Sequence, residues 1–266
     1  MSLYPAPRSA VWQGRGLVCK VRRYMLRKTS PGDAGPLREI EDLWGEKSPP
    51  PLRGAGRSPC PTTNHFERNA RENGYQVIGG IDEAGRGALA GPVVAAAVVF
   101  PPDYANPDIR DSKQLSPRKR EKLFEIIKGD ALCVGLGVVE APVIDAVNIL
   151  RATLTAMKEA VLDLSLPPDY LLIDGINRIS LSTGQETIIR GDSLSVSVAA
   201  ASIIAKVSRD KIMEIYHRQF PQYNFLRNKG YGTEEHRGAI KQNGHCKIHR
   251  RSFHLKDEDT SWDLFE

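Results

Sequence analysis

Short β-favouring runs alternate with helical patterns from residue 75 onward, and this alternation constrains the fold more than any other feature of the sequence. Apolar, β-favouring runs occupy residues 75–81, 92–100, 132–140 and 169–175. Each run has the length of a typical strand and is bounded by Gly, Pro, Asp or Glu. We therefore expect these runs to be strands, joined by one more β-favouring run that follows a polar loop after residue 175.

The segments between and after these runs carry helix signals. Residues 117–128 follow Ser116, a preferred N-cap residue, and Gly129 favours the end of that helix. Residues 197–220, rich in small side chains, and residues 233–244 indicate two more helices. Another helix is predicted by an apolar stripe at steps of four and three residues: Leu150, Leu154, Met157, Val161 and Leu164. Helices that pack against a sheet make an α/β domain.

The composition is that of a globular protein with one domain. Of the 266 residues, 41% are hydrophobic and 26% are charged, and no apolar run approaches the length of about 20 residues that crosses a bilayer. Lys and Arg outnumber Asp and Glu by 37 to 32, an excess that is compatible with a polyanionic partner. The four cysteines include no C-x-x-C pair, which indicates a reducing compartment. We expect a cytoplasmic protein without membrane association.

The first part of the chain differs from the rest. Residues 1–72 are rich in Pro, Gly, Arg and Ser without sustained periodicity, so we expect a low-order basic extension followed by a single domain over residues 73–266. Residues 1–30 contain basic but no acidic side chains. That bias is typical of an organelle transit peptide and equally of a nucleic-acid-binding arm, so an organelle location is the alternative.

The stretch IGGIDEAGRGALAGP at residues 78–92 ends an apolar run with two adjacent carboxylates, Asp82 and Glu83. The glycines that follow imitate a dinucleotide-binding loop. However, the carboxylates would repel a pyrophosphate, and Pro92 and Val93 begin a strand rather than the required helix. Taken alone, such a pair is more often a solvated turn.

Further carboxylates at the ends of apolar runs favour a functional site over a solvated turn. Asp174 closes LLID, and Asp192 follows Gly191 in IIRGD. A cluster of carboxylates from separate strands is the oxygen-only ligand set that Mg²⁺ and similar ions prefer. Two such ions activate a water and stabilise the leaving oxygen of a phosphodiester. Asp82, Glu83, Asp174 and Asp192 are therefore a candidate metal site, provided that the fold brings them together.

Six sequence blocks in order resemble one known family. They are GIDEAGRG, DSKQLSPRKRE, LLIDG, GDSLSVSVAAASIIAKVSRD, FPQYNFLRNKGYGTEEH and HRRSF. From about Gln76 to Phe253 the chain is similar to ribonuclease HII, the type 2 ribonuclease H. The resemblance implies a ribonuclease H-like mixed five-stranded sheet flanked by helices, with a small helical C-terminal part. It also implies endonucleolytic cleavage of RNA in RNA–DNA hybrids, and cleavage on the 5′ side of ribonucleotides embedded in duplex DNA.

The resemblance also implies roles for individual residues. Asp82, Glu83 and Asp174 match the family's first three acidic positions, and Asp192 matches the fourth, with Asp210 as the other candidate. These carboxylates would be catalytic and would hold two divalent ions, Mg²⁺ or Mn²⁺. The residues that match the nucleic-acid contacts are Gly85, Arg86 and Gly87, the ribose-recognition loop; Tyr231, which would pack on the sugar; and Lys113, Lys206, Lys229 and Arg250, placed to meet phosphates.

Three alternatives remain open. Another two-metal nuclease of the same fold would share the carboxylates but lack the Gly-Arg-Gly loop and the tyrosine, and a non-catalytic hybrid-binding protein would need only the basic residues. A zinc site at His245, Cys246, His249 and His254 is disfavoured, because the cysteine pair of a usual site is missing. The expected partners are RNA–DNA hybrids and ribonucleotide-containing duplex DNA, bound by a monomer.

Overall fold

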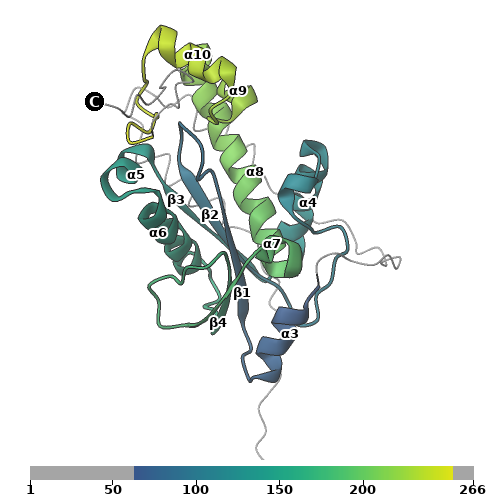
Figure 1. Ribbon diagram of the computed structural model, residues 1–266. Coiled ribbons are helices and arrows are strands. Elements are labelled where there is room, and N and C mark those ends of the chain that lie inside the picture. The colour runs from purple at the N-terminus through teal and green to yellow at the C-terminus, as the bar shows by residue number, and fades with distance from the viewer. Residues whose placement is uncertain (1–62, 254–266) are drawn as a thin grey trace, which may run out of the picture.

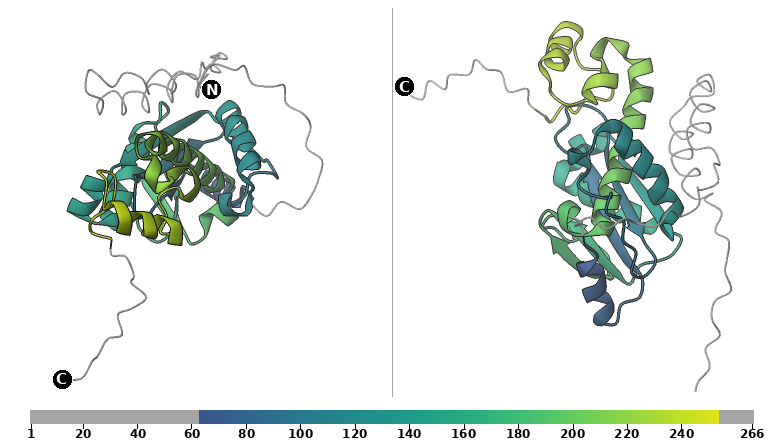
Figure 2. Two further views of the ribbon diagram at one scale, coloured as in Figure 1. Left: turned by 90° about the horizontal axis from the view of Figure 1, so that it is seen from above. Right: turned by 90° about the vertical axis from the view of Figure 1, so that its right-hand side faces the viewer.

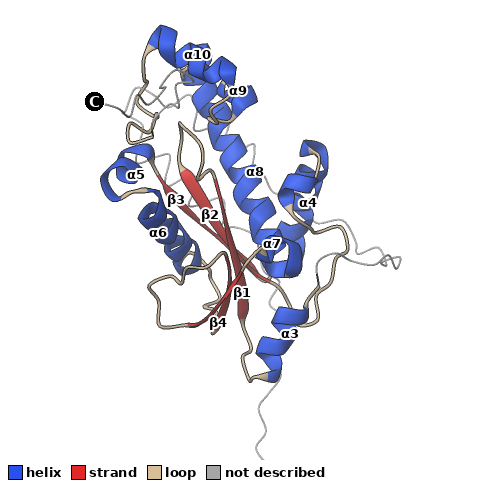
Figure 3. Cartoon of the chain, viewed as in Figure 1, coloured by secondary structure: helices blue, strands red, loops and turns tan. Residues whose placement is uncertain are grey.

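A mixed sheet forms the centre of the protein, which we describe from a computed structural model over residues 63–253 (Figure 1). The sheet has five strands in the order β3-β2-β1-β4-β5. β1 is antiparallel to β2 and parallel to β4, β3 is antiparallel to β2, and β5 is parallel to β4 (Figure 3). The strand bounds are β1 Ile78–Ala84, β2 Val93–Val99, β3 Cys133–Val139, β4 Tyr170–Asp174 and β5 Gly184–Ile188. The predicted mixed five-stranded sheet is confirmed.

Helices cover both faces of this sheet. α8 packs on β1 and β2 with α4 outside it, and α6 packs on β2 and β3 from the opposite side (Figure 1). Each face buries its own apolar cluster. The helices are α3 His65–Glu72, α4 Pro117–Asp130, α5 Ala141–Val147, α6 Ile149–Leu162, α7 Gly191–Leu194, α8 Val196–Gln219, α9 Phe225–Asn228 and α10 Glu234–Asn243.

The stripe predicted for α6 is wrong at its start. Leu150 is 40% exposed, although the face that carries Met157 and Val161 of the same stripe is buried. That buried face includes Ala156 and Ala160, whose carbonyls lie against Gly137 and Gly135 of β3. A side chain at either glycine would collide with the helix backbone. Close packing of alanines on glycines, rather than the largest apolar side chains, therefore sets the rotation of α6.

The expected extension of low order is wrong over residues 63–72. Helix α3 lies there and packs on the domain, with Ala70 buried. Glu67 is buried too and accepts hydrogen bonds from the Ser195 hydroxyl at 2.6 Å and the Ser197 amide at 3.0 Å. These bonds cap the start of α8, so α3 belongs to the domain. Residues 1–62 and 254–266 lie outside the described residues.

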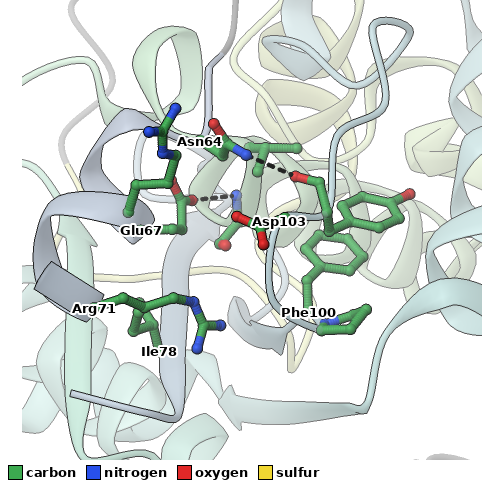
Figure 4. Close-up of a pocket in the computed structure, with 11 residues that line it drawn as sticks. Asn64, Glu67, Arg71, Ile78, Phe100 and Asp103 are labelled. Carbon is green, nitrogen blue, oxygen red and sulfur yellow. Dashed lines mark hydrogen bonds between the residues drawn. The ribbon is translucent and has the colours of Figure 1, made fainter. Parts of the chain in front are cut away.

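A small pocket lies between α3 and the sheet, beside Ile78 at the start of β1 (Figure 4). Figure 4 shows Glu67 and Asn64 at its rim, with the Asn64 amide donating to the Tyr104 carbonyl at 3.5 Å. Asp82 lies toward the other end of the same strand. The pocket is therefore separate from the carboxylates that the sequence singles out.

The C-terminal part is helical and small, as expected. α9 and α10 gather at the end of α8, next to the loop between β1 and β2 (Figures 1 and 2). The Leu89 amide of that loop donates to the Gly230 carbonyl at 2.8 Å, which joins the two segments directly. Within the described part of the chain, no helix combines the length and apolar character that crossing a membrane requires.

Candidate active site and nucleic-acid interface

The topology brings the first three predicted carboxylates to one edge of the sheet. β1 and β4 are parallel neighbours with Ile81 opposite Ile173, so the next residues, Asp82 and Asp174, lie side by side at the carboxyl ends of their strands. Glu83 follows Asp82 on β1. Carboxyl ends of neighbouring parallel strands are the usual place for a site in such sheets.

Asp82 lies deepest in this group and is only 5% exposed. Burial raises its pKa well above the usual range, and the charges of Glu83 and Asp174 raise it further. A hydrogen bond with Ser202 of α8 and the Glu83 amide, which donates to Asp82 Oδ1 at 2.7 Å, act in the opposite direction. The carboxylates are therefore close enough to repel one another in a poorly hydrated place.

The negative charge of Glu83 has a cationic neighbour, which none of the groups around Asp82 provides in the same way. Burial raises its pKa, and the nearby Arg86 guanidinium lowers it. Arg86 Nη1 lies 3.1 Å from Glu83 Oε1, so the arginine of the Gly-Arg-Gly loop reaches back to the acidic group. This ion pair places the loop at the edge of the carboxylate cluster.

Asp174 positions the fourth carboxylate. Its Oδ1 accepts a hydrogen bond from the Gly191 amide at 2.7 Å, which fixes the start of α7. Asp192 therefore lies in the first turn of that short helix and not at a strand end. Burial raises the pKa of Asp192, as do the charges of Asp111 and Asp174, while Lys113 lowers it.

The structure separates the two candidates for the fourth position. Asp192 interacts with Asp174, whereas Asp210 forms an ion pair with Lys206 at 2.7 Å, one turn earlier on α8. Asp192 is the residue that joins the other carboxylates. Its catalytic role remains a prediction.

The acidic group fits a hard divalent cation by its donor chemistry. Its donors are all oxygens, and the Asp82 carboxyl group is buried. Lys113 Nζ lies 3.6 Å from Asp192 Oδ2 with a side chain that is 83% exposed. Within residues 63–253, no three His, Cys, Asp or Glu side chains stand in a metal-coordinating arrangement. That result covers Cys246 and His249 of the disfavoured zinc site, whereas His254 lies outside those residues.

Two buried arginines hold the segment between β1 and β2, which includes the Gly-Arg-Gly loop. Arg250 donates to the carbonyls of Gly85 at 2.7 Å, Arg86 at 2.8 Å and Gly91 at 3.0 Å. The prediction that Arg250 contacts phosphate is wrong, because the side chain is 1% exposed and its donors face the loop backbone. Burial, together with the charge of Arg209, lowers its pKa to about 9.

Arg209 of α8 was not identified from the sequence. It donates to the carbonyls of Ala90, Pro92 and Lys229, at 3.0, 2.9 and 2.8 Å, and so ties the loop after β1 to the segment that precedes Tyr231. A Cβ at Gly85, whose φ is +95°, would collide with the Arg209 side chain. Arg209 is followed by Asp210 and Lys211, so its local sequence is that of an exposed charged turn and gives no signal of this buried role.

Gly87 is free of such constraints. A Cβ there would meet no atom within 4 Å, and its φ lies outside the left-handed region. Gly87 and the neighbouring Arg86 are both exposed. The fold itself therefore does not require glycine at position 87.

Tyr231 lies half-buried between two cations. Lys206 Nζ is 5.7 Å and Arg209 Cζ 5.3 Å from the centre of its ring. Lys206 pairs with Asp210, and Lys229 pairs with Glu214 at 2.9 Å. Phosphate contacts by either lysine would therefore compete with these ion pairs and remain predictions.

Comparison with known proteins assigns the family. A sequence model of ribonuclease HII matches residues 79–256. The chain belongs to the ribonuclease HII family. It is 71% identical over 193 residues to ribonuclease HII of Syntrophus aciditrophicus (73% of this chain, 91% of the relative) and 56% identical over 198 residues to that of Geotalea uraniireducens (73% and 92%). The family makes the enzyme a metal-dependent endoribonuclease that acts on RNA–DNA hybrids.

Solved structures agree with this assignment. Ribonuclease HII of Archaeoglobus fulgidus, solved in complex with PCNA, matches with a TM-score of 0.58 at 25% identity over 69% of this chain and 98% of that chain. Ribonuclease H2 of Pyrococcus horikoshii matches with a TM-score of 0.57, also at 25% identity, over 67% and 94%. The ribonuclease H-like fold expected from the sequence is confirmed.

Proposed function

We propose that this enzyme, besides cutting RNA in hybrids, nicks duplex DNA on the 5′ side of single embedded ribonucleotides. The observation that carries the proposal is the joining of the acidic edge to a ribose-recognition surface. Arg86 pairs with Glu83 on one side, and Arg209 connects the loop after β1 to the Tyr231 segment on the other. A nucleic-acid strand that binds along this surface passes from Tyr231 over Gly87 to the carboxylates.

We further propose that Asp82, Glu83, Asp174 and Asp192 hold two divalent ions, Mg²⁺ or Mn²⁺. When bound, such ions activate a water and stabilise the leaving oxygen of the phosphodiester. The protein contributes position: the sheet edge fixes Asp82 and Asp174, and the hydrogen bond from Gly191 to Asp174 fixes the helix that carries Asp192. Buried carboxylates that repel one another favour a cation between them.

Recognition of the ribose falls to the Gly-Arg-Gly loop and Tyr231. The loop backbone at Gly87 is open to close approach, and a 2′-hydroxyl is the group that distinguishes RNA from DNA. Tyr231 would pack its ring on the sugar of the neighbouring deoxynucleotide. All of these groups come from one chain, which supports an enzyme that is active as a monomer; light scattering on the active fraction tests that state.

The test is cleavage of a labelled DNA duplex that contains one ribonucleotide, with an all-DNA duplex and a long RNA–DNA hybrid beside it. Each is incubated with Mg²⁺, with Mn²⁺ and with a chelator, and products are resolved to single nucleotides. We expect a metal-dependent nick on the 5′ side of the ribose and an intact all-DNA duplex. Cutting of the hybrid without that nick would remove the proposal while leaving the family activity in place.

A further inference from the structure

A pair of buried histidines lies beneath Tyr231. His236 of α10 is 0% exposed and His249 is 3% exposed, and their Nε2 atoms are 3.1 Å apart. His236 Nδ1 lies 2.9 Å from the carbonyl oxygen of Tyr231. The pair is separate from the carboxylates, and nothing in the metal chemistry uses it.

The contacts allow only one assignment of protons to the neutral pair. The Tyr231 carbonyl can only accept, so His236 Nδ1 carries a proton and its Nε2 is an acceptor. His249 Nε2 must then donate to it, which makes His249 Nδ1 an acceptor. The Cys246 amide at 2.9 Å and the Cys246 thiol at 3.1 Å supply the donors that His249 Nδ1 needs.

The surroundings keep both rings neutral and fixed. Burial lowers the pKa of His249 to about 4, and the nearby His236 and His245 contribute to that shift. Burial also lowers the pKa of His236. The ring of Tyr223 packs on His249 with centroids 4.8 Å apart, which restricts rotation of the imidazole.

The far end of this chain of hydrogen bonds reaches the loop after β1. His249 forms an antiparallel bridge with Ala90, and on either side of it the Gly91 amide donates to Ile248 and the Arg250 amide donates to Leu89, both at 2.8 Å. Tyr231 is thus connected through two imidazoles to the backbone that carries the Gly-Arg-Gly loop.

We propose that His236 and His249 are positioning residues, whose fixed tautomers hold Tyr231 at a set distance from the Gly-Arg-Gly loop and thereby favour cleavage at a single embedded ribonucleotide. The inference rests on the proposed function, since it takes Tyr231 as the residue that packs on the sugar beside the ribose. A long hybrid offers a ribose to the Gly-Arg-Gly loop wherever the enzyme binds along it. Cleavage of long hybrids therefore depends less on the distance between Tyr231 and that loop.

Two substitutions at position 236 separate this role from simple packing. The amide of Asn can take the place of Nδ1, so His236→Asn keeps the donor to Tyr231 and loses the contact with His249. The amide of Gln takes the place of Nε2, so His236→Gln keeps the contact with His249 and loses the donor to Tyr231. We expect kcat/KM on the single-ribonucleotide duplex to fall roughly tenfold in either variant, because each breaks one of the two links that join Tyr231 to the loop.

Tyr231→Ala and wild type are measured in parallel on both substrates. A selective loss on the single-ribonucleotide duplex in Tyr231→Ala and His236→Gln supports the inference. Equal losses on both substrates in His236→Gln, while Tyr231→Ala remains selective, overturn the inference alone. Equal losses in Tyr231→Ala overturn the proposed role of Tyr231 and the inference with it.

Nitrogen-15 spectra of the imidazoles in the wild-type enzyme test the tautomers without any variant. We expect His236 protonated at Nδ1 and His249 protonated at Nε2 near neutral pH. Either ring in the opposite tautomer, or either ring charged, overturns the inference even if both substitutions prevent folding.

Discussion

The acidic edge and the loops beside it are positioned by different means. Asp82 and Asp174 are placed by backbone pairing of parallel strands, and their charges are left to repel one another. The loops are placed by side chains: Arg250 donates to the Gly85 carbonyl, His236 donates to the Tyr231 carbonyl, and Arg209 donates to the carbonyls of Ala90 and Lys229, which follow the Gly-Arg-Gly loop and precede Tyr231. In the acidic region, carboxylates that repel one another are held by the paired strands of the sheet. In the loops, the backbone carbonyls of irregular segments are hydrogen-bonded by buried side chains.

This difference predicts different consequences of substitution. At the acidic edge, removal of a charge should harm catalysis and spare the fold, since the sheet remains intact. In the loops, removal of a buried donor should harm the fold first, because it leaves carbonyls without a partner.

Asp82→Asn should lower the cleavage rate by roughly a thousandfold or more, because one oxygen ligand of the proposed metal site loses its charge. Thermal unfolding should show no loss of stability, since a buried charge next to other carboxylates is removed. Asp103→Asn, an exposed acid near Ile78 at the other end of the sheet, is the matched control. An active Asp82→Asn enzyme would contradict the metal-site assignment.

Arg250→Met should destabilise the protein by about 3 kcal/mol or more, because three loop carbonyls lose their donor in a buried place. Denaturant unfolding measures this loss. The exposed neighbour serves as control, since Arg251→Ala should change stability by less than about 0.5 kcal/mol. A stable Arg250→Met protein with normal hybrid cleavage would show that the loop does not need its arginine.

Gly85→Ala and Gly87→Ala should differ although they lie in one loop. The first should cost about 2 kcal/mol or more of stability, since a Cβ meets Arg209 at a φ of +95°. The second should leave stability within about 0.5 kcal/mol and slow cleavage at embedded ribonucleotides roughly tenfold. Denaturant unfolding and cleavage assays on both variants measure these two effects. If Gly87→Ala cleaves normally, close approach of the ribose to this backbone is excluded.

Acidification should weaken the loop region through the histidine pair. His249 has a folded pKa of about 4 and an ordinary unfolded value of about 6.5, so below that value the unfolded chain binds more protons. Neutral His249 contributes its full share to the free energy of unfolding above about pH 6.5, and this share decreases as the pH falls toward 4. At pH 5 the decrease should be about 1 kcal/mol after allowance for solvent screening.

The histidine prediction is measured as the slope of unfolding free energy against pH. His249→Gln should have a shallower slope than wild type between pH 7 and 5. Identical slopes in wild type and His249→Gln would show that His249 does not remain neutral in the folded protein.

Much of the framework was predictable because it depends on local patterns. The four early β-favouring runs are strands, and α4 begins at Pro117 after Ser116, whose hydroxyl accepts from the Lys119 amide at 3.3 Å. The carboxylates Asp82, Glu83 and Asp174 stand together because strand ends can be recognised from sequence and parallel strands end at one edge.

Other features depended on partners far along the chain. Helix α3 has few apolar residues and is held through Glu67 by Ser195, 128 residues later. Arg250 has the same basic character as an exposed phosphate ligand, and only its position under Gly85 shows otherwise. The rotation of α6 follows from glycines on β3, which no stripe within the helix reveals.

Local sequence patterns were sufficient to predict the α/β architecture, the order of the strands along the chain and the residues from which a metal site could be built. Propensity, capping and turn chemistry act over a few residues, so they can be recognised in a single segment. Tertiary structure decided that Asp192 rather than Asp210 joins the acidic edge, and that arginines and histidines support the recognition loops. Those outcomes depend on burial and on hydrogen-bond partners, which exist only once distant segments have packed.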